Sequence, residues 1–279
     1  MRHFASCAAA VVLLMGSVVR ADPQDIQSAS EPVGQFGTVG QQSAGIVNGG
    51  QACGPTSTYN SFVYLQNQFG VTGLFQNGAA SNTINQLGVD MNPNNTNTGV
   101  SPNGVSEQQL VNGKTTYING QTLNKPITIE SQVNPGGVGT NLTWEFIMAQ
   151  LRAGQDVELG WRWTTGGGHV VTLTGMTWDP DLNTGTMSFL DPYNPAGGNA
   201  PALPITGTVN GTDATGFQLS YSGGAAGPDS DPDNPGNAST GNLSVVAAES
   251  VPEPIGVGAI ACCCALLLSR GRRRAPQAA

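Results

Sequence analysis

Apolar side chains recur at helical spacing in two parts of the chain. Between residues 53 and 69 they return every three or four positions, which predicts a helix. Pro55 suits the first turn of this helix, and Gly70 is placed to end it. Residues 143–153 show the same spacing and are followed by Gly154, so we expect a second helix there.

Shorter apolar runs in the middle of the chain have the character of β-strands. Residues 115–118 and 127–130 predict two short strands around an Asn-Gly turn. The strongest strand pattern covers three runs, which are residues 157–161, 169–175 and 187–190. The last of them ends at Asp191, and the gaps between them are short. Short gaps favour an antiparallel sheet.

Polar segments rich in glycine separate these elements. Residues 76–104 predict loops with one short helix near residues 83–87. Residues 179–185 predict a hairpin turn, with calcium binding as the alternative, although they lack the glycine and the acid that an EF-hand loop requires. Asp229, Asp231 and Asp233 predict a solvated acidic linker, and calcium binding is again the alternative.

The patterns divide the chain into five segments. Residues 46–222 form the expected folded domain, after a polar leader arm at residues 22–45. Residues 223–250 are a linker rich in Gly, Asp and Pro that contains an edge strand or a stalk at residues 243–248. The two ends, residues 1–21 and 251–279, differ from the rest in charge and hydropathy.

Composition and charge narrow the class of protein. Hydrophobic residues make up 38% of the chain and charged residues only 10%, which indicates a folded, loop-rich protein and not a disordered one. Of the ten Lys and Arg residues, six lie in the two ends, whereas 17 of the 18 acidic residues lie between positions 22 and 249. Because no basic patch exists outside the ends, nucleic acid is not an expected partner.

The N-terminal segment has the three parts of a secretory signal peptide. Arg2 supplies the positive start, residues 8–15 are apolar, and Val19 and Ala21 offer small side chains before a cleavage site after Ala21. Signal peptidase is therefore an expected processing enzyme. The alternative is a first helix of the fold, but a proline at position 23 would break such a helix at once.

The C-terminal segment consists of Val-Pro-Glu-Pro at residues 251–254, an apolar stretch at residues 255–269 and an arginine-rich end. This arrangement resembles the PEP-CTERM sorting signal of Gram-negative bacteria. The resemblance implies transient anchoring in the inner membrane by a short transmembrane tail and cleavage by an exosortase. It also implies secretion to, or display on, the cell surface. A plain tail anchor is the alternative.

The segment between the two ends retains one cysteine, Cys53, and one histidine, His169. Cys53 stands at the start of a predicted helix, where unpaired N–H groups favour a thiolate over a thiol. His169 opens an apolar strand after three glycines, and Asp191 ends the next strand. A hairpin would bring Asp191 to the second imidazole nitrogen, as in a nucleophile–base–orienter triad. One Cys and one His cannot supply the usual zinc ligands, so no metal is expected.

Three sequence blocks resemble the C39-like peptidases, a papain-like group of cysteine peptidases. They are Cys-Gly-Pro-Thr-Ser at residues 53–57, the run from the helix at 143–153 to Gly-His-Val-Val at 168–171, and Phe-Leu-Asp-Pro at 189–192. The resemblance implies an α+β, papain-like fold in which an N-terminal catalytic helix packs on an antiparallel sheet. It also implies Cys53 as nucleophile, His169 as general base and acid, and Asp191 as orienting residue.

The chain departs from the family at the oxyanion donor. The family usually has a glutamine about six residues before the cysteine, and this chain has Val47 there. Gln51 is our candidate for the missing amide donor, and Asn48 is the second choice. Removing one such donor typically lowers the rate by about 10²–10³.

We therefore expect an exported cysteine peptidase that hydrolyses peptides or proteins through a thioester acyl-enzyme, without metal or organic cofactor. Two alternatives stay open. One is an amidase that acts on cell-wall peptides. The other is a non-catalytic surface or extracellular-matrix binding protein on a peptidase-like fold, which the displaced glutamine and the Asn/Gly-rich loops favour.

Overall fold

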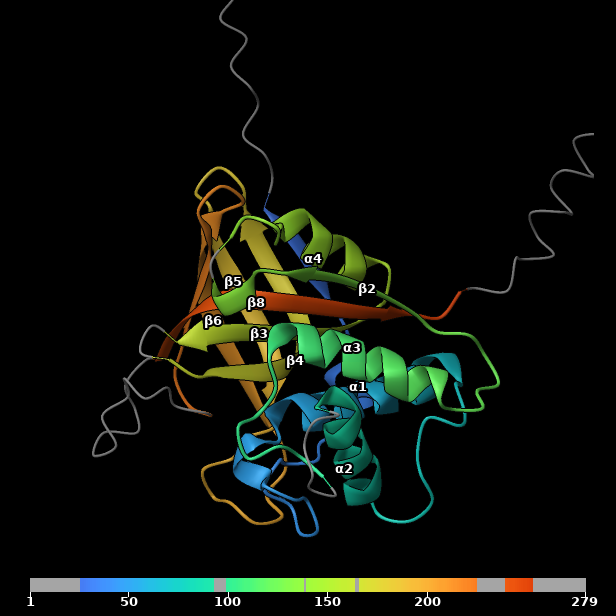
Figure 1. Ribbon diagram of the computed structural model, residues 1–279. Helices are drawn as coiled ribbons and strands as arrows, with labels where there is room; N and C mark the ends of the chain where they lie inside the picture. Colours follow the sequence, from blue (N-terminus) through green and yellow to red (C-terminus); the bar gives the residue numbers. More distant parts are fainter. Residues whose placement is uncertain (1–25, 93–98, 138, 164–165, 225–238, 253–279) are drawn as a thin grey trace, which may run out of the picture.

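The computed structural model describes residues 26–92, 99–137, 139–163, 166–224 and 239–252 (Figure 1). The predicted signal peptide, the acidic residues at 229–233 and the C-terminal sorting segment from residue 253 lie outside these described residues. None of the helices in the described part of the chain has the length and apolar character needed to cross a membrane.

Six strands form a closed antiparallel barrel. Around the barrel they follow the order β4, β3, β8, β7, β6 and β5, and β5 pairs with β4 to close the ring. Their bounds are β3 Asp156–Trp163, β4 Gly168–Asp179, β5 Thr184–Asp191, β6 Leu203–Thr212, β7 Gly216–Tyr221 and β8 Ser239–Ser250. Closure removes the unpaired edges that an open sheet would leave.

Two further strands and four α-helices surround the barrel. Strand β1 pairs with β4 and strand β2 with β8. Figure 1 shows α1, α2 and α3 grouped on one side of the barrel and α4 on another part of it. The bounds are β1 Gln27–Ser30, β2 Thr128–Val133, α1 Cys53–Phe69, α2 Ala80–Met91, α3 Glu107–Asn119 and α4 Trp144–Arg152, with 3₁₀ turns at Val33–Gln35, Gly49–Gln51 and Pro135–Gly137.

The predicted fold class is wrong. The described chain is mostly β, with a closed barrel in place of an antiparallel sheet that carries an N-terminal helix. The sequence patterns do not predict β6, because Pro204 and Gly207 interrupt its apolar face. They also leave out β7, although Phe217, Leu219 and Tyr221 alternate along it. The segment at residues 243–248 is not at an edge, since β8 lies between β3 and β7.

Several elements were predicted correctly. Helix α1 has the expected bounds and ends at Gly70, whose φ of 65° is left-handed. Helix α4 and strands β3, β4 and β5 also lie where the patterns placed them, and residues 180–183 connect β4 to β5 as a hairpin turn. Asp179 accepts the backbone N–H groups of Asp181 and Leu182 in this turn. Helix α2 contains the short helix expected near residues 83–87 and is longer.

The strand expected at residues 115–118 is part of helix α3. Ser106 and Gln109 form a capping box that starts this helix, with Ser106 accepting from the backbone of Gln109 and Gln109 accepting from the backbone of Ser106. Thr115 and Thr116 donate their hydroxyl groups to carbonyls four residues earlier. The helix start and the buried apolar face therefore outweigh the strand propensity of two threonines, a tyrosine and an isoleucine.

The polar leader arm expected at residues 22–45 is packed on the fold where it is described. Residues 27–30 form β1, and the ring of Phe36 stacks on Tyr64 of α1 with 4.4 Å between centroids. Asn60 of α1 accepts the backbone N–H of Val39 and donates to its carbonyl. This segment therefore packs against α1 through a ring contact and a pair of hydrogen bonds.

Buried side chains form two cores. The barrel interior includes Trp161 and Phe189, with α4 contributing Ile147 and Leu151. The second core lies between the helices and the outer face of the barrel; it includes Phe62, Leu65, Leu110, Tyr117, Val170 and Val245. Burying one large apolar side chain stabilises a fold by about 1.5–3 kcal/mol, so the second core holds the helical layer firmly against β3, β4 and β8.

Candidate active site

Cys53 is the first residue of helix α1 and is partly exposed. The residue before it, Ala52, provides no side-chain hydrogen bond to cap the helix. The free N–H groups of the first turn therefore concentrate positive potential around the sulfur atom. No other free cysteine occurs in the part of the chain that the structure describes.

His169 lies on strand β4, next to the start of α1. The Ser57 hydroxyl of α1 donates to the carbonyl oxygen of Val170 at 2.9 Å. In return, the Thr172 hydroxyl of β4 donates to the carbonyl oxygen of Ser57 at 3.1 Å. Ser57 and Thr172 are fully buried, and His169 and Val170 are almost fully buried. The two reciprocal bonds fix the position of α1 along β4, and with it the position of Cys53 relative to His169.

Two tryptophans of β3 enclose the imidazole. The Trp161 ring meets it edge-on with 5.4 Å between ring centroids, and the Trp163 ring stacks on it at 6.1 Å. His169 is only 4% exposed as a result. Trp161 belongs to the barrel core and also lines the pocket described below.

Asp191 is the last residue of β5 and is fully buried. Its Oδ1 atom lies 2.6 Å from Nε2 of His169 and also accepts the backbone N–H of Tyr193. Because Nε2 faces the carboxylate, Nδ1 is the ring nitrogen left for Cys53. The structure thus brings together Cys53, His169 and Asp191, as the sequence predicted, although their role as a catalytic triad stays a prediction.

The pKa values of the two central groups shift toward an ion pair. Burial would raise the pKa of the Cys53 thiol, but the hydrogen bond to His169, its charge and the backbone N–H groups of Val170 and Gly54 lower it. Burial would lower the pKa of His169, whereas Asp191 and Cys53 together raise it to about 10. Both shifts favour a thiolate beside an imidazolium at neutral pH.

A pocket with a cavity volume of about 90 Å³ opens beside the sulfur atom. Its floor is formed by the barrel, through Gly160, Trp161 and His169, and one wall by the loop and helix from Asn103 to Leu110. A volume of this size exceeds the roughly 30 Å³ that one water molecule occupies in the liquid. The pocket can therefore admit a small side chain or a segment of peptide backbone next to Cys53.

Gln51 lines this pocket, and Asn48 is not among its lining residues. The side chain of Asn48 donates instead to the carbonyl oxygen of Val100 at 2.7 Å. The backbone N–H of Val47 is bound by Asn85 on α2. Of the two amide donors that the sequence offered, only Gln51 lines the pocket that Cys53 also lines.

The pocket contains an ion pair that the sequence analysis missed. Arg162 of β3 donates through Nε and Nη2 to both carboxylate oxygens of Glu107 on α3, at 2.6 and 3.0 Å. Burial would raise the pKa of Glu107, but the bond to Arg162 lowers it. Arg162 is one of only four basic residues between the two ends of the chain, and that rarity was the available signal.

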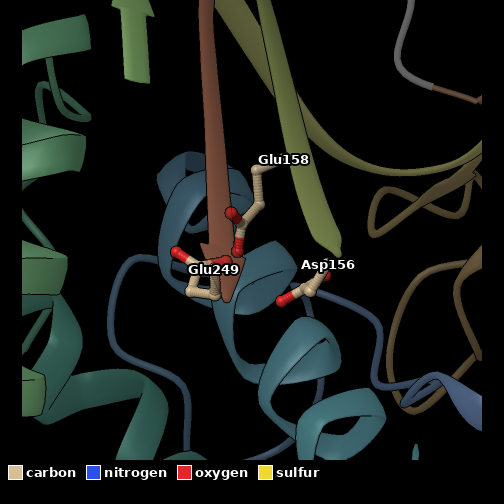
Figure 2. Close-up of side chains that lie close together, drawn as sticks. All are labelled: Asp156, Glu158 and Glu249. Carbon is tan, nitrogen blue, oxygen red and sulfur yellow. The ribbon is translucent and has the colours of Figure 1, made fainter. Parts of the chain in front are cut away.

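A second cluster of ionisable groups is buried at the far end of the same strand. Asp156 and Glu158 of β3 and Glu249 of β8 each offer a carboxylate oxygen within 4.8 Å of the others (Figure 2). In the part of the chain with described side chains, these are the residues close enough together to surround a cation. The ammonium group of Lys114 from α3 already pairs with Glu158 and Glu249, so the cation is supplied by the chain itself.

Known proteins add no identification to this geometry. No model of a protein family matches the chain, and no curated protein matches it in sequence. The feature that bears on function is therefore the arrangement of Cys53, His169 and Asp191 beside one pocket.

Proposed function

We propose that the protein is an exported cysteine peptidase of the C39-like type, with Cys53 as nucleophile. The observation that carries the proposal is the imidazole of His169, bound at Nε2 by Asp191 and hydrogen-bonded to the thiol of Cys53 beside a pocket. A nucleophile, a base and an orienting carboxylate in contact, with space for a substrate, are what covalent acyl transfer requires.

The first half of the proposed reaction forms an acyl-enzyme. The Cys53 thiolate attacks the carbonyl carbon of the scissile peptide bond, and the electron pair of the carbonyl moves onto its oxygen. The Gln51 amide and the backbone N–H of Cys53 stabilise this oxyanion. His169 then donates its proton to the amide nitrogen, the C–N bond breaks, and the amine leaves a thioester on Cys53.

The second half regenerates the enzyme. Neutral His169 takes a proton from water, and the hydroxide attacks the thioester carbonyl. The C–S bond breaks, and the acid product and the thiolate–imidazolium pair result. Asp191 holds the ring orientation through both halves and stabilises the charged imidazole, as its 2.6 Å contact allows.

To test the proposal, the full chain is incubated with a library of peptides, and the products are identified by mass spectrometry. The proposal requires cleavage that Cys53→Ala abolishes while the far-UV circular dichroism spectrum stays unchanged. Cleavage that persists in Cys53→Ala, or the absence of cleavage across plain peptides and muropeptides alike, would contradict it. Preferential cleavage of muropeptides would assign the cell-wall amidase instead.

One observation favours the non-catalytic alternative. The position six residues before Cys53 is Val47, and the loss of an oxyanion donor there is what a surface-binding descendant of a peptidase would show. The distinguishing measurement is acylation of Cys53 by activated esters, which does not need a good peptide substrate. A thiolate that is never acylated would favour a binding protein.

Export and sorting are part of the proposal. The supporting residues are the signal sequence at residues 1–21 and the Val-Pro-Glu-Pro segment at residues 251–254. Signal peptidase and an exosortase would process the chain, and the inner membrane would hold its tail for a time. The mass of the mature protein from a host with and without its exosortase tests this part separately.

A further inference from the structure

The buried cluster of Lys114, Asp156, Glu158 and Glu249 joins three elements. Lys114 belongs to α3, Asp156 and Glu158 belong to β3, and Glu249 belongs to β8. All four side chains are fully buried. Figure 2 shows the three carboxylates converging between β3 and the end of β8, beside helix α1. The cluster therefore lies at the boundary between the helical layer and the barrel.

The charges within this cluster do not balance. Three carboxyl groups face one ammonium group, and both carboxylate oxygens of Asp156 lack a hydrogen-bond donor of suitable geometry. From α1, Ser61 and Tyr64 face Asp156, and Tyr64 in turn donates to Glu31; these neighbours bring no positive charge. An unpaired charge in a dry interior is strongly unfavourable.

No second cation of the described chain is available to this cluster. The other described basic side chains bind elsewhere: Lys125 the carbonyl of Phe69, Arg152 the side chain of Gln27, Arg162 Glu107, and His169 Asp191. The surplus negative charge is therefore relieved by protons held on the carboxyl groups, unless an external cation replaces them.

The cluster is connected to the pocket through α3 and β3. On α3, Glu107 and Lys114 are seven residues apart and so lie on the same face. On β3, Glu158 and Arg162 are four residues apart and also share a face. Two ion pairs, Lys114–Glu158 and Glu107–Arg162, thus fasten the helix to the strand, and the second of them lines the pocket.

We propose that the Lys114–Asp156–Glu158–Glu249 cluster is a proton-dependent latch. While the carboxyl groups hold their shared protons, the cluster keeps α3, and with it the pocket wall that contains Glu107, on the barrel. When the carboxyl groups lose these protons in alkaline solution, α3 loosens. The latch regulates the site of the proposed function but does not depend on hydrolysis there.

The direction of the pKa shifts agrees with this geometry. Burial, the largest cause, and the neighbouring carboxylates raise the pKa of Asp156 to about 7 and those of Glu158 and Glu249 to about 8, against the opposing effect of Lys114. The folded protein then holds protons that the unfolded chain releases near pH 4. Stability from these groups is complete at low pH and is lost as the pH rises through about 8.

The first test compares the full wild-type chain with Glu249→Gln, which carries a permanently neutral amide. Urea unfolding is followed at intervals from about pH 5 to about pH 9. The ratio of the folding equilibrium constant of Glu249→Gln to that of wild type should rise with pH. The rise should be up to about tenfold per pH unit for each proton that folded wild type holds and the variant does not. Glu145→Gln removes an exposed carboxyl of α4 and serves as the matched control, with a profile parallel to wild type.

The second test locates the change by hydrogen exchange on the wild-type chain, with rates corrected for the intrinsic effect of pH. Amides of α3 should lose at least about tenfold protection between pH 6.5 and pH 9 relative to those of β5 and β6, and Glu249→Gln should suppress that loss. This measurement stands even if Glu249→Gln is destabilised at every pH.

Two results would overturn the latch. Parallel pH profiles for wild type and Glu249→Gln, with uniform protection in α3, would show that the cluster holds no titrating proton. Stabilisation of the wild-type chain at alkaline pH by Mg²⁺, Ca²⁺ or Mn²⁺, lost in Glu249→Gln, would show that a metal ion balances the charge instead. Neither readout uses peptide cleavage, so the latch and the peptidase can fail independently.

Discussion

At the scale of single residues, the imidazole of His169 is shared between an acid and a thiol. Asp191 binds one ring nitrogen at 2.6 Å, which leaves the other for Cys53, and two tryptophan rings limit the motion of the ring. The same contacts that orient the ring also raise its pKa, so geometry and charge favour the same protonated state.

The pH dependence of Cys53 alkylation should show this ion pair. Iodoacetamide should modify Cys53 with an apparent pKa below the ordinary value of about 8.5. His169→Ala should raise that apparent pKa to or above the ordinary value, because burial then acts without the opposing charge. Peptide mass mapping identifies the modified residue in the full chain. An unchanged profile in His169→Ala would mean that the two groups are not coupled.

Replacing Asp191 by Asn should separate the effect of the carboxylate charge on His169 from the effect of the side-chain volume. The amide keeps the volume of the carboxyl group but removes the negative charge that raises the pKa of His169. We expect the imidazole pKa, followed by NMR, to fall from about 10 toward or below about 6.5. Turnover, where it is measured, should fall by up to about 10⁴. Retention of a strongly raised pKa would show that Cys53 alone sustains it.

Gln51→Ala tests the oxyanion donor separately from the ion pair. Because Gln51 lines the pocket and does not contribute to the pKa shift of Cys53, alkylation should be unchanged while kcat falls by about 10²–10³. Asn48→Ala is the matched control, since the side chain of Asn48 is bound to Val100. Equal loss of kcat in both variants would assign the effect to the loop and not to the Gln51 amide.

At the scale of secondary-structure elements, the position of α1 on β4 decides whether the site exists. Ser57→Ala should remove one of the two reciprocal bonds and deprive the buried carbonyl of Val170 of the hydroxyl that donates to it. We expect a loss of about 1–3 kcal/mol in the free energy of unfolding, measured by urea denaturation. Thr115 on α3 is exposed, so Thr115→Ala serves as the comparison and should change the free energy of unfolding by less than Ser57→Ala does. A neutral Ser57→Ala would show that packing alone positions α1.

The sequence predicted those elements whose local patterns are strong. The helix that begins at Cys53 has a proline near its start, a glycine at its end and a regular apolar face, and the strands around His169 are rich in Val and Leu. Strand β6 was missed because Pro204 and Gly207 interrupt its pattern, whereas β7 was missed although its apolar residues alternate regularly over six positions. Arg162 and Glu107 were missed because their pairing joins residues 55 positions apart.

At the scale of the whole molecule, closure of the barrel depends on the last described strand. β8 pairs with β3, β7 and β2. Its Leu243 belongs to the barrel core, and its Val245 belongs to the core under the helices. A chain that ends at residue 224 should therefore lack cooperative thermal unfolding, as read by near-UV circular dichroism. A chain that ends at residue 252 keeps β8 and should unfold cooperatively. Cooperative unfolding of both chains would mean that β3 and β7 need no strand between them.

The place of β8 in the chain also determines when the pocket is completed during synthesis. Ser244 and Val245 of β8 line the pocket, although Cys53 is made almost two hundred residues earlier. A ribosome releases the chain from its N-terminus onward, so Cys53, His169 and Asp191 all emerge before the strand that encloses them. A nascent chain thus has its thiol and its histidine before the pocket is finished, and the catalysis proposed for Cys53 should begin only after β8 has been made.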